Sequence, residues 1–482
     1  MGALGAGMSA RRRANAGFRD HEAGHDPAQA LAERKLLFVV CAAGGGSIID
    51  SFLPVLDTEV VNGEPASLDV YPESLIRQPE GSNIRCLRNL SNTSYFTPTF
   101  SMEGFLQNHY PDTVVLTHEN TSVNHEVAQR RAVTGAGIDS GRTILEAAAL
   151  RHGSDLLLPN CAMATGGYIA PGTDASLPRW ARGEIVADPL MFASSTHGYR
   201  GVLGAPDAAL IERARGVRRQ LDDASPFGQT FRDSPLRQQY LSLRDENQAG
   251  VEVADLISKL MLVPQDALPS KFGLESSPIV DLVRETFPSM YTDPWQAKAA
   301  LSFALAYFGV SCAVSLSVDF EPVGTTSSLI STPLAFDYSH NDHRVAQNIM
   351  WGRVCLVLDG LIRLLKSSDY LGDPALGKMW DRSLVYVATD FGREKIRPFN
   401  SGSYGTGHHL NNGSLLISPL LKGNQVFGGI DPDTLLTYGF DRESGAPEPG
   451  SLMREGDVYS AVAQALDIEF AQRRDMSAMM KA

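Results

Sequence analysis

The residues best suited to chemistry lie in the C-terminal half of the chain. The segment FDYSHNDH places Asp337 and His340 three residues apart and Asp342 beside His343, so a single loop offers both carboxylates and imidazoles. Mixed Asp and His ligation is typical of zinc or manganese, and paired metal sites are the usual means of cleaving phosphate or sulfate esters. We therefore expect a divalent metal cofactor, zinc in the first place, with manganese, magnesium or calcium as alternatives.

Two further segments add potential metal ligands. Asp390 follows five strand-like residues in VYVATDFGR, and His408 lies in the glycine-rich GTGHH. An acid at the end of an apolar strand has no packing role there, and titratable groups that gather at successive strand ends indicate a functional site. Taken singly, such residues also suit turns and helix caps, and Asp342 fits the N-cap of the helical segment that follows it.

Arg393, three residues after Asp390, allows two interpretations. Its guanidinium matches the geometry of phosphate and sulfate oxyanions, so it could clamp a substrate. Alternatively, it forms a structural ion pair with Asp390.

The elements that must position these residues alternate along the chain between apolar strands and amphipathic helices. This alternation predicts an α/β fold with a mostly parallel sheet sandwiched by helices, in which ligands bind at the carboxyl ends of the strands. After a first strand in LLFVVCAAGGG, we expect strands at 113–116, 155–158, 312–318 and 384–388. Helices are expected at 125–131, 142–151, 251–262, 294–308 and 344–365.

The domain organisation follows from changes in composition. Residues 1–34 are polar and aperiodic, which predicts a mobile tail. Residues 35–482 are expected to form a single α/β domain with a more charged, helical insertion at about 205–288. The tail contains the pattern H-E-x-x-H at 21–25, but Gly24 and Pro27 disfavour the helix that a zinc-protease motif requires.

Composition limits the classes of function. The net charge of 42 − 55 = −13 excludes a simple nucleic-acid binder, which needs cationic surface. No apolar run reaches the ~18 residues of a membrane span, and no secretory signal is visible. The five cysteines are scattered through apolar segments, so we expect buried free thiols and a reducing, cytoplasmic location.

Four segments together resemble the alkaline-phosphatase superfamily, more narrowly its bacterial sulfatase-like branch known as a domain of unknown function. The segments are MWDRSLVYVATDFGR, GTGHH, LLKGNQVFGG and REGDVYSAVAQALDIE, and the similarity runs in order from about Leu36 to Phe470. The resemblance implies an alkaline-phosphatase-like fold and a metal-dependent hydrolase acting on phosphate or sulfate esters of small molecules or glycans. It also makes the periplasm an alternative location, and it leaves the oligomeric state open.

Carried over residue by residue, the resemblance implies a pair of metal sites. Asp337 and His340 (or His343) with His408 would form one site, and Asp390 would belong to the other.

The segment NHEVAQRRAVTG is similar to the family's Ser-His-x-x-Ala-Gln helix start. The similarity places His125 and Gln129 near the pocket, at a helix N-terminus suited to an anion. The family's serine falls on Asn124, whereas in the wider superfamily a hydroxyl or formylglycine at such a position is the nucleophile. Ser122 and Thr121 are close enough in sequence to replace it, and we take Ser122 as the candidate.

Two carboxylates of the family's pattern are also missing. The metal-binding aspartate after the glycine pair falls on Ser47, with Asp50 three residues later, and the aspartate of a Gly-Thr-Asp-His loop has become Gly407. Either the chain is a one-metal or altered-metal enzyme, or it is a catalytically degenerate homologue that acts as a binding or scaffold protein.

Overall fold

A computed structural model describes residues 31–89, 100–193, 208–234, 237, 256–268, 275–318 and 335–481. Within this range the chain divides into two compact units, one formed by Ala187–Tyr291 and the other by Ala28–Val186 together with Thr292–Ala482. The larger unit contains all the candidate site residues named above.

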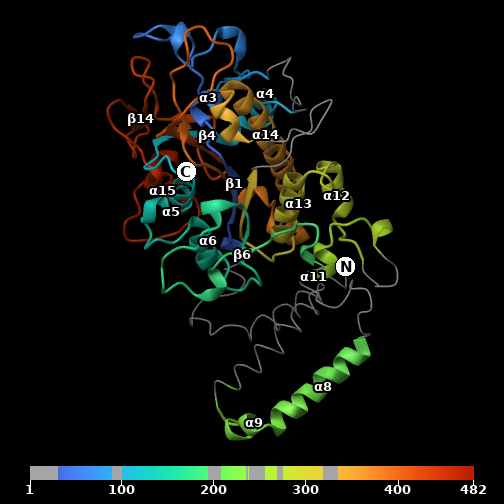
Figure 1. The fold of residues 1–482 in the computed structure, drawn as a ribbon. Helices are drawn as coiled ribbons and strands as arrows, with labels where there is room; N and C mark the ends of the chain where they lie inside the picture. Colours follow the sequence, from blue (N-terminus) through green and yellow to red (C-terminus); the bar gives the residue numbers. More distant parts are fainter. Residues whose placement is uncertain are drawn as a thin grey trace. The chain divides into compact units, whose positions relative to one another are not determined.

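The centre of the larger unit is an eight-stranded sheet in the order β12-β4-β11-β8-β1-β7-β5-β6 (Figure 1). Neighbouring strands pair in parallel, except that β11 runs antiparallel to β4 and β8. The predicted α/β class with a mostly parallel sheet is therefore confirmed. The strands are β1 (Leu36–Ala42), β4 (Thr113–Glu119), β5 (Asn160–Met163), β6 (Glu184–Ile185), β7 (Ala313–Val318), β8 (Ser383–Thr389), β11 (Asn411–Ile417) and β12 (Gln425–Phe427).

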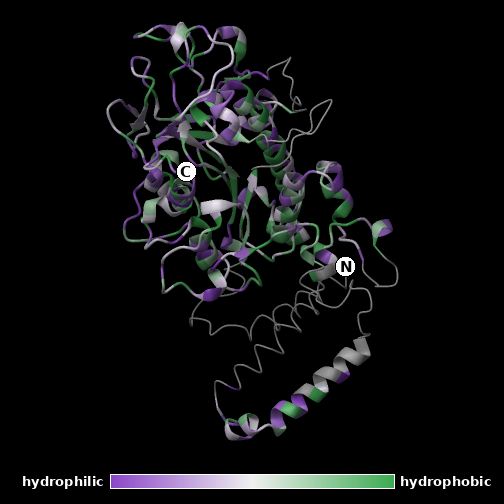
Figure 2. Ribbon diagram, viewed as in Figure 1, coloured by the Kyte–Doolittle hydropathy of each residue, from purple (hydrophilic) through white to green (hydrophobic). Residues whose placement is uncertain are grey.

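The inner strands are buried on both faces, which explains their continuous apolar sequences. Every residue of β1, β7 and β8 is buried, and the central strands are mainly hydrophobic in colour (Figure 2). In register, Val39 of β1 lies between Ser315 of β7 and Tyr386 of β8. All five cysteines are buried and free of disulfides, as predicted.

Helices cover both faces of the sheet (Figure 1). One face is covered by α5 (His125–Thr134), α6 (Ile144–His152) and α15 (Glu455–Ala465), and the other by α3 (Ile48–Phe52), α4 (Met102–His109), α13 (Pro294–Tyr307) and α14 (His343–Ser367). Five of these helices, α4, α5, α6, α13 and α14, begin directly after a Ser, Asn, Thr or Asp whose side chain accepts from a backbone amide of the first turn. Asp342 accepts a hydrogen bond from the Val345 amide at 3.3 Å, which confirms it as the N-cap of α14.

Short strands form three smaller sheets around the central one. They are β2 (Ile76–Arg77) with β3 (Cys86–Leu87), β9 (Gly392–Arg393) with β10 (His408–His409), and β13 (Gly429–Ile430) with β14 (Thr437–Phe440) and β15 (Pro447–Glu448). The β9–β10 ribbon matters most here, because it carries two candidate site residues.

The strand predicted at 155–158 is wrong, since these residues form a turn and the strand β5 begins at Asn160. Pro159 separates the two segments and has no amide to donate, while its carbonyl accepts from the amides of Cys312 and Ala313. The ladder with β7 therefore starts only after the proline.

The N-terminal boundary also differs from the prediction. Residues 1–30, with the H-E-x-x-H pattern, lie outside the described residues. Arg34, assigned to the tail, is buried and donates to the His152 carbonyl at 2.9 Å, so it belongs to the folded part of the chain.

The smaller unit is helical where it is described. Its helices are α8 (Ala208–Ala224), α9 (Pro226–Thr230), α11 (Leu256–Leu260) and α12 (Val280–Thr286). Residues 251–255 of the predicted helix 251–262 lie outside the described range.

Among the described helices, none combines the length and the apolar character needed to cross a membrane.

Gly392 in β9 tests how tightly the β9–β10 ribbon is held. A β-carbon there would lie 1.8 Å from the Asn411 carbonyl oxygen, so Gly392→Ala must push β9 away from the start of β11. We expect it to lower the free energy of unfolding by about 1–3 kcal/mol, as overpacking does, in urea denaturation. Gly402→Ala is the control, because a β-carbon there meets no atom within 4 Å. Equal stability of the two variants would contradict tight packing of this ribbon.

Candidate metal centre

The carboxyl ends of four parallel strands bring polar residues to one edge of the sheet. Asp390 follows β8 directly, and Gly44 lies in the turn after β1. His125 and Gln129 belong to α5, which follows β4, and Tyr168 lies in the 3-10 helix Gly166–Ile169 after β5. This is the edge where parallel sheets place their sites.

Asp390 is fully buried and accepts four hydrogen bonds. Its Oδ1 accepts from the Tyr168 hydroxyl at 2.6 Å. Its Oδ2 accepts from His125 Nδ1 at 2.7 Å, Gln129 Nε2 at 3.0 Å and the Gly44 amide at 3.1 Å. Both oxygens therefore have donors from the protein, and His125 is one of them.

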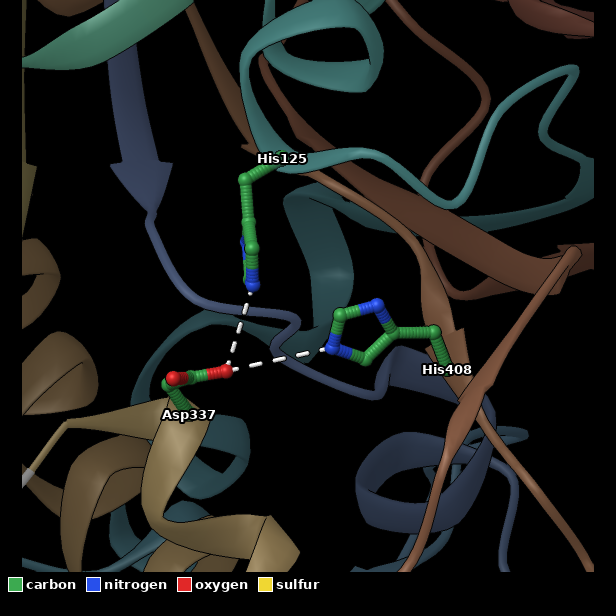
Figure 3. Close-up of side chains that lie close together, drawn as sticks. All are labelled: His125, Asp337 and His408. Carbon is green, nitrogen blue, oxygen red and sulfur yellow. Dashed lines mark ion pairs between the residues drawn. The ribbon is translucent and has the colours of Figure 1, made fainter.

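His125 connects Asp390 to a second carboxylate, Asp337. Figure 3 shows the His125 ring facing Asp337. Its Nδ1 donates to Asp390, so its Nε2 faces Asp337 Oδ1 at 3.2 Å. Burial disfavours the charged imidazole, but the contacts with Asp337 and Asp390 outweigh burial and raise the pKa of His125 to about 9. Phe391 packs against the ring, with the two ring centres 4.7 Å apart.

Asp337 and His340 lie three residues apart in the 3-10 helix η9 (Phe336–His340). Side chains at this spacing eclipse each other in a 3-10 helix, so both point the same way. His340 Nε2 lies 3.4 Å from Asp337 Oδ1. The nearby His125 imidazole holds the pKa of Asp337 at about 2, against the effect of partial burial.

His408 completes the group from β10. Its Nδ1 donates to the Val123 carbonyl at 2.9 Å, so its Nε2 faces inward, 2.8 Å from His340 Nε2 and 3.9 Å from Asp337 Oδ1. His409, the next residue in the strand, lies on the other side, as strand alternation requires. There its Nδ1 accepts from the Asn411 amide at 3.2 Å.

We call His125, Asp337, His340 and His408 the His-Asp centre. Four of the separations between its donor atoms run from 2.8 to 3.9 Å, and the donor atoms of His125, Asp337 and His408 all lie within 4.8 Å of one another. Ligand atoms around a tetrahedral zinc, with bonds of about 2.0–2.1 Å, lie about 3.3 Å apart. Asp337 Oδ1 is buried and close to three imidazoles, yet none of them donates a well-aligned hydrogen bond to it. The donor atoms of His125, Asp337 and His408 could therefore hold a metal ion, while His340 Nε2 also lies 3.4 Å from the Arg393 guanidinium.

Arg393 holds the turn after β1 against η9. Its fully buried guanidinium donates to the carbonyls of Gly44, Gly45 and Phe336, the last two at 3.3 Å, and lies 3.5 Å from Asp337 Oδ1. Gly45 has φ +83°, and a β-carbon there would come within 2.9 Å of this guanidinium. Among the described ion pairs, Arg393 therefore pairs with Asp337, whereas the sequence suggested Asp390.

His343, the alternative ligand to His340, lies in a separate buried group. Its Nε2 is 3.3 Å from Asp50 Oδ2 and 3.0 Å from Asp69 Oδ2, and all three side chains are fully buried. Lys395 pairs with Asp50, and Arg344 Nε lies 3.3 Å from Asp69 Oδ1. We call these five residues the buried ionic cluster. Burial alone would lower the pKa of His343, but the negative charges of Asp69 and Asp50 outweigh burial and raise this pKa to about 9.

The loop before α5 explains the asparagine at the family's serine position. Asn124 is the N-cap of α5 and accepts from the Val127 amide at 3.2 Å. Ser122 Oγ accepts from the Asn124 amide at 3.1 Å and is partly exposed. Its neighbour Val123 is the residue whose carbonyl binds His408. Ser122 is thus adjacent along the chain to a residue that contacts the His-Asp centre.

Ser47 and Gly407, where the resemblance would place carboxylates, have different surroundings. Ser47 is buried, and within the described residues its Oγ has no hydrogen-bond partner. At Gly407, a β-carbon would lie 2.7 Å from the carboxylate of Glu394, which accepts from the Gly407 amide at 3.1 Å. A carboxylate is therefore present beside position 407, but Glu394 supplies it.

Three residues of this region escaped the sequence analysis. Tyr168 was missed because the preceding strand was placed too early, which hid a glycine-rich strand end in TGGYI. Asp69 and Lys395 lie in loops without apolar periodicity. No local pattern identifies them, because their partners are distant in sequence.

Comparison with known proteins gives little to set beside this geometry. No family model and no curated protein matches the chain. A solved structure, that of Ps i-CgsB in complex with k-i-k-neocarrahexaose, aligns at 11% identity over 92% of this chain and 75% of its own, with a TM-score of 0.28. A superposition this loose transfers neither fold nor ligand to this chain.

The raised pKa of His125 can be measured directly in protein freed of metal by a chelator. We expect its imidazole to titrate near pH 9 by NMR, and Asp390→Asn, which removes a charge at constant size, to bring the pKa toward the ordinary 6.5. Because the folded value lies above the unfolded one, this group stabilises the fold fully below about pH 6.5 and ceases to do so above about pH 9. A wild-type His125 titrating at 6.5 would contradict the paired arrangement.

Proposed function

We propose that the protein is a metal-dependent hydrolase of phosphate or sulfate esters and that the His-Asp centre holds its divalent ion, zinc in the first place. The observation that carries this proposal is the orientation of His125 and His408. In each ring Nδ1 donates outward, to Asp390 or to the Val123 carbonyl, so that Nε2 faces the other donors. Such outer acceptors are the usual companions of histidines that bind metal.

The ligands would be His125, Asp337, His340 and His408. A divalent ion bound there supplies a Lewis acid that polarises the ester oxygen and lowers the pKa of water or a hydroxyl. The side chains of His340 and Asp337 are 42% and 33% exposed, so a substrate can reach them from solvent. This exposure supports an ester of a small molecule or glycan as the substrate class.

Residues behind the ligands hold them in place. Asp390 fixes the tautomer and direction of His125, and Phe391 stacks on His408 with ring centres 4.0 Å apart. Arg393 is too deeply buried to meet a substrate, so we propose that it positions Asp337 and the Gly44–Gly45 turn.

Ser122 is our candidate nucleophile, with water as the alternative. Its Oγ already accepts from the Asn124 amide, which leaves its proton available for transfer to a base. The loop that carries Ser122 ends at His125, the first residue of α5. The proposed metal ligand His125 therefore lies at the positive end of the helix dipole. An anionic ester bound there would meet both.

The alternative is a homologue that binds ligands without turnover. Asn124 caps a helix where the family has a serine, and Asp50 lies in the buried ionic cluster. These two features favour the alternative, and measurement of metal content together with activity separates it from the hydrolase.

The metal proposal is tested by comparing two adjacent histidines. We expect the purified wild type, reloaded with zinc, to hold bound metal and to cleave an aryl phosphate or an aryl sulfate. His408→Ala should lose both properties, because it removes one of four ligands. His409→Ala, which alters the opposite side of the same strand, should keep both.

Metal content by elemental analysis and release of the phenol are the two readouts. A wild type that takes up no divalent metal after reloading would exclude the hydrolase. Metal bound in full without turnover of either ester class would favour the binding alternative.

The nucleophile is tested by Ser122→Ala. If Ser122 attacks the ester, we expect kcat to fall by about 1,000-fold or more, as when an enzyme loses its nucleophile, with metal content unchanged. Steady-state kinetics and elemental analysis on the same preparation measure both. Unchanged turnover would assign the attack to water.

A further inference from the structure

Metal sites that cleave phosphate esters commonly hold two ions, about 3.5–4 Å apart. The residue expected in a second site, Asp390, has both oxygens occupied by Tyr168, His125, Gln129 and the Gly44 amide. Three of these bonds go to Oδ2 and one to Oδ1, and among the described residues Asp390 belongs to neither group of carboxylate and imidazole donors that could hold a metal ion. The donors present do not fit a second metal at Asp390.

The buried ionic cluster contains the donor atoms that a second ion would need. Asp50 Oδ2, Asp69 Oδ2 and His343 Nε2 lie within 4.8 Å of one another, and all three side chains are fully buried. Asp50 Oδ2 and His343 Nε2 form no well-aligned hydrogen bond. Two carboxylate oxygens and one imidazole nitrogen that point toward one another are donors that suit a divalent cation.

The charge of this cluster argues against an ion. Lys395 Nζ pairs with Asp50 Oδ1, and Arg344 Nε lies 3.3 Å from Asp69 Oδ1, so the two carboxylates meet two positive charges even before the His343 imidazole is counted. A divalent ion would leave a net charge of +2 in a fully buried group, at a large cost in desolvation. Lys395 is itself nearly buried, with its side chain 10% exposed.

The same chain segments serve both groups. Arg393 contacts Asp337 of the His-Asp centre, and Lys395, two residues later, contacts Asp50 of the cluster. The segment 406–408 also contacts both groups. The Thr406 hydroxyl lies 3.2 Å from His343 Nδ1 of the cluster, and His408 belongs to the His-Asp centre. The charge state of the cluster therefore bears on residues directly adjacent to the proposed ligands.

We propose that the protein binds a single metal ion and that Lys395 supplies, within the buried ionic cluster, the positive charge that a second ion would otherwise bring. The single ion rests on the proposed function, whereas the role of Lys395 rests only on the cluster.

Metal stoichiometry after zinc loading, measured by native mass spectrometry, tests the proposal. We expect one zinc in the wild type, none in His408→Ala and two in Lys395→Met, which keeps the length of the side chain but removes its charge. Lys395→Arg is the matched control and should hold one. Adding Asp50→Asn to Lys395→Met removes a donor and should return the count to one.

Each outcome bears on one part of the proposal. A second zinc in the wild type that survives in His408→Ala would overturn it, and so would a folded Lys395→Met protein that gains no zinc. If Lys395→Met fails to fold, the wild type and His408→Ala decide, because any zinc left in His408→Ala that is lost when Asp50→Asn is added must come from the cluster. A wild type that binds no zinc, together with a Lys395→Met protein that binds one zinc ion, would contradict the proposed function but support the role of Lys395.

Discussion

The buried carboxylate of Asp390 is the constraint on which the rest of this site depends. A carboxylate removed from water is tolerated only when donors replace its solvation, and here the donors come from the ends of three other strands. Tyr168 follows β5, His125 follows β4, and Gly44 follows β1. Because these donors converge on one buried carboxylate, they link the sheet edge, the helix α5 and the direction of the His125 ring.

Close backbone approach is the second requirement, and glycine meets it. A β-carbon at Gly44 would lie 2.9 Å from the Asp337 amide nitrogen, and one at Gly405 would lie 1.9 Å from the His340 carbonyl oxygen. These contacts press the turn after β1 and the loop before β10 against opposite parts of η9. Arg393 then joins the first turn to η9 through carbonyl groups. Because glycine has no side chain, these segments let the turn after β1, η9 and the loop before β10 pack closely together.

Sequence patterns predicted the framework better than the roles within it. Continuous apolar runs identified β1 and β8, because a strand buried on both faces must be apolar throughout. The pattern placed Asp390 at a strand end but could not tell a ligand from a positioning residue, since that depends on Tyr168, far away in sequence. It also left His340 and His343 as alternatives. The 3-10 geometry of η9 aligns His340 with Asp337, whereas His343 begins an α-helix and faces Asp50 and Asp69.

Charge gives the two polar groups different relations to a cation. In the buried ionic cluster, Lys395 and Arg344 lie against the carboxylates of Asp50 and Asp69, and the imidazole of His343 adds a further basic group. A cation entering this cluster would meet basic side chains that already balance its two acids, in surroundings where an uncompensated charge is costly. The His-Asp centre differs, because its three imidazoles and one carboxylate meet a single guanidinium, that of Arg393.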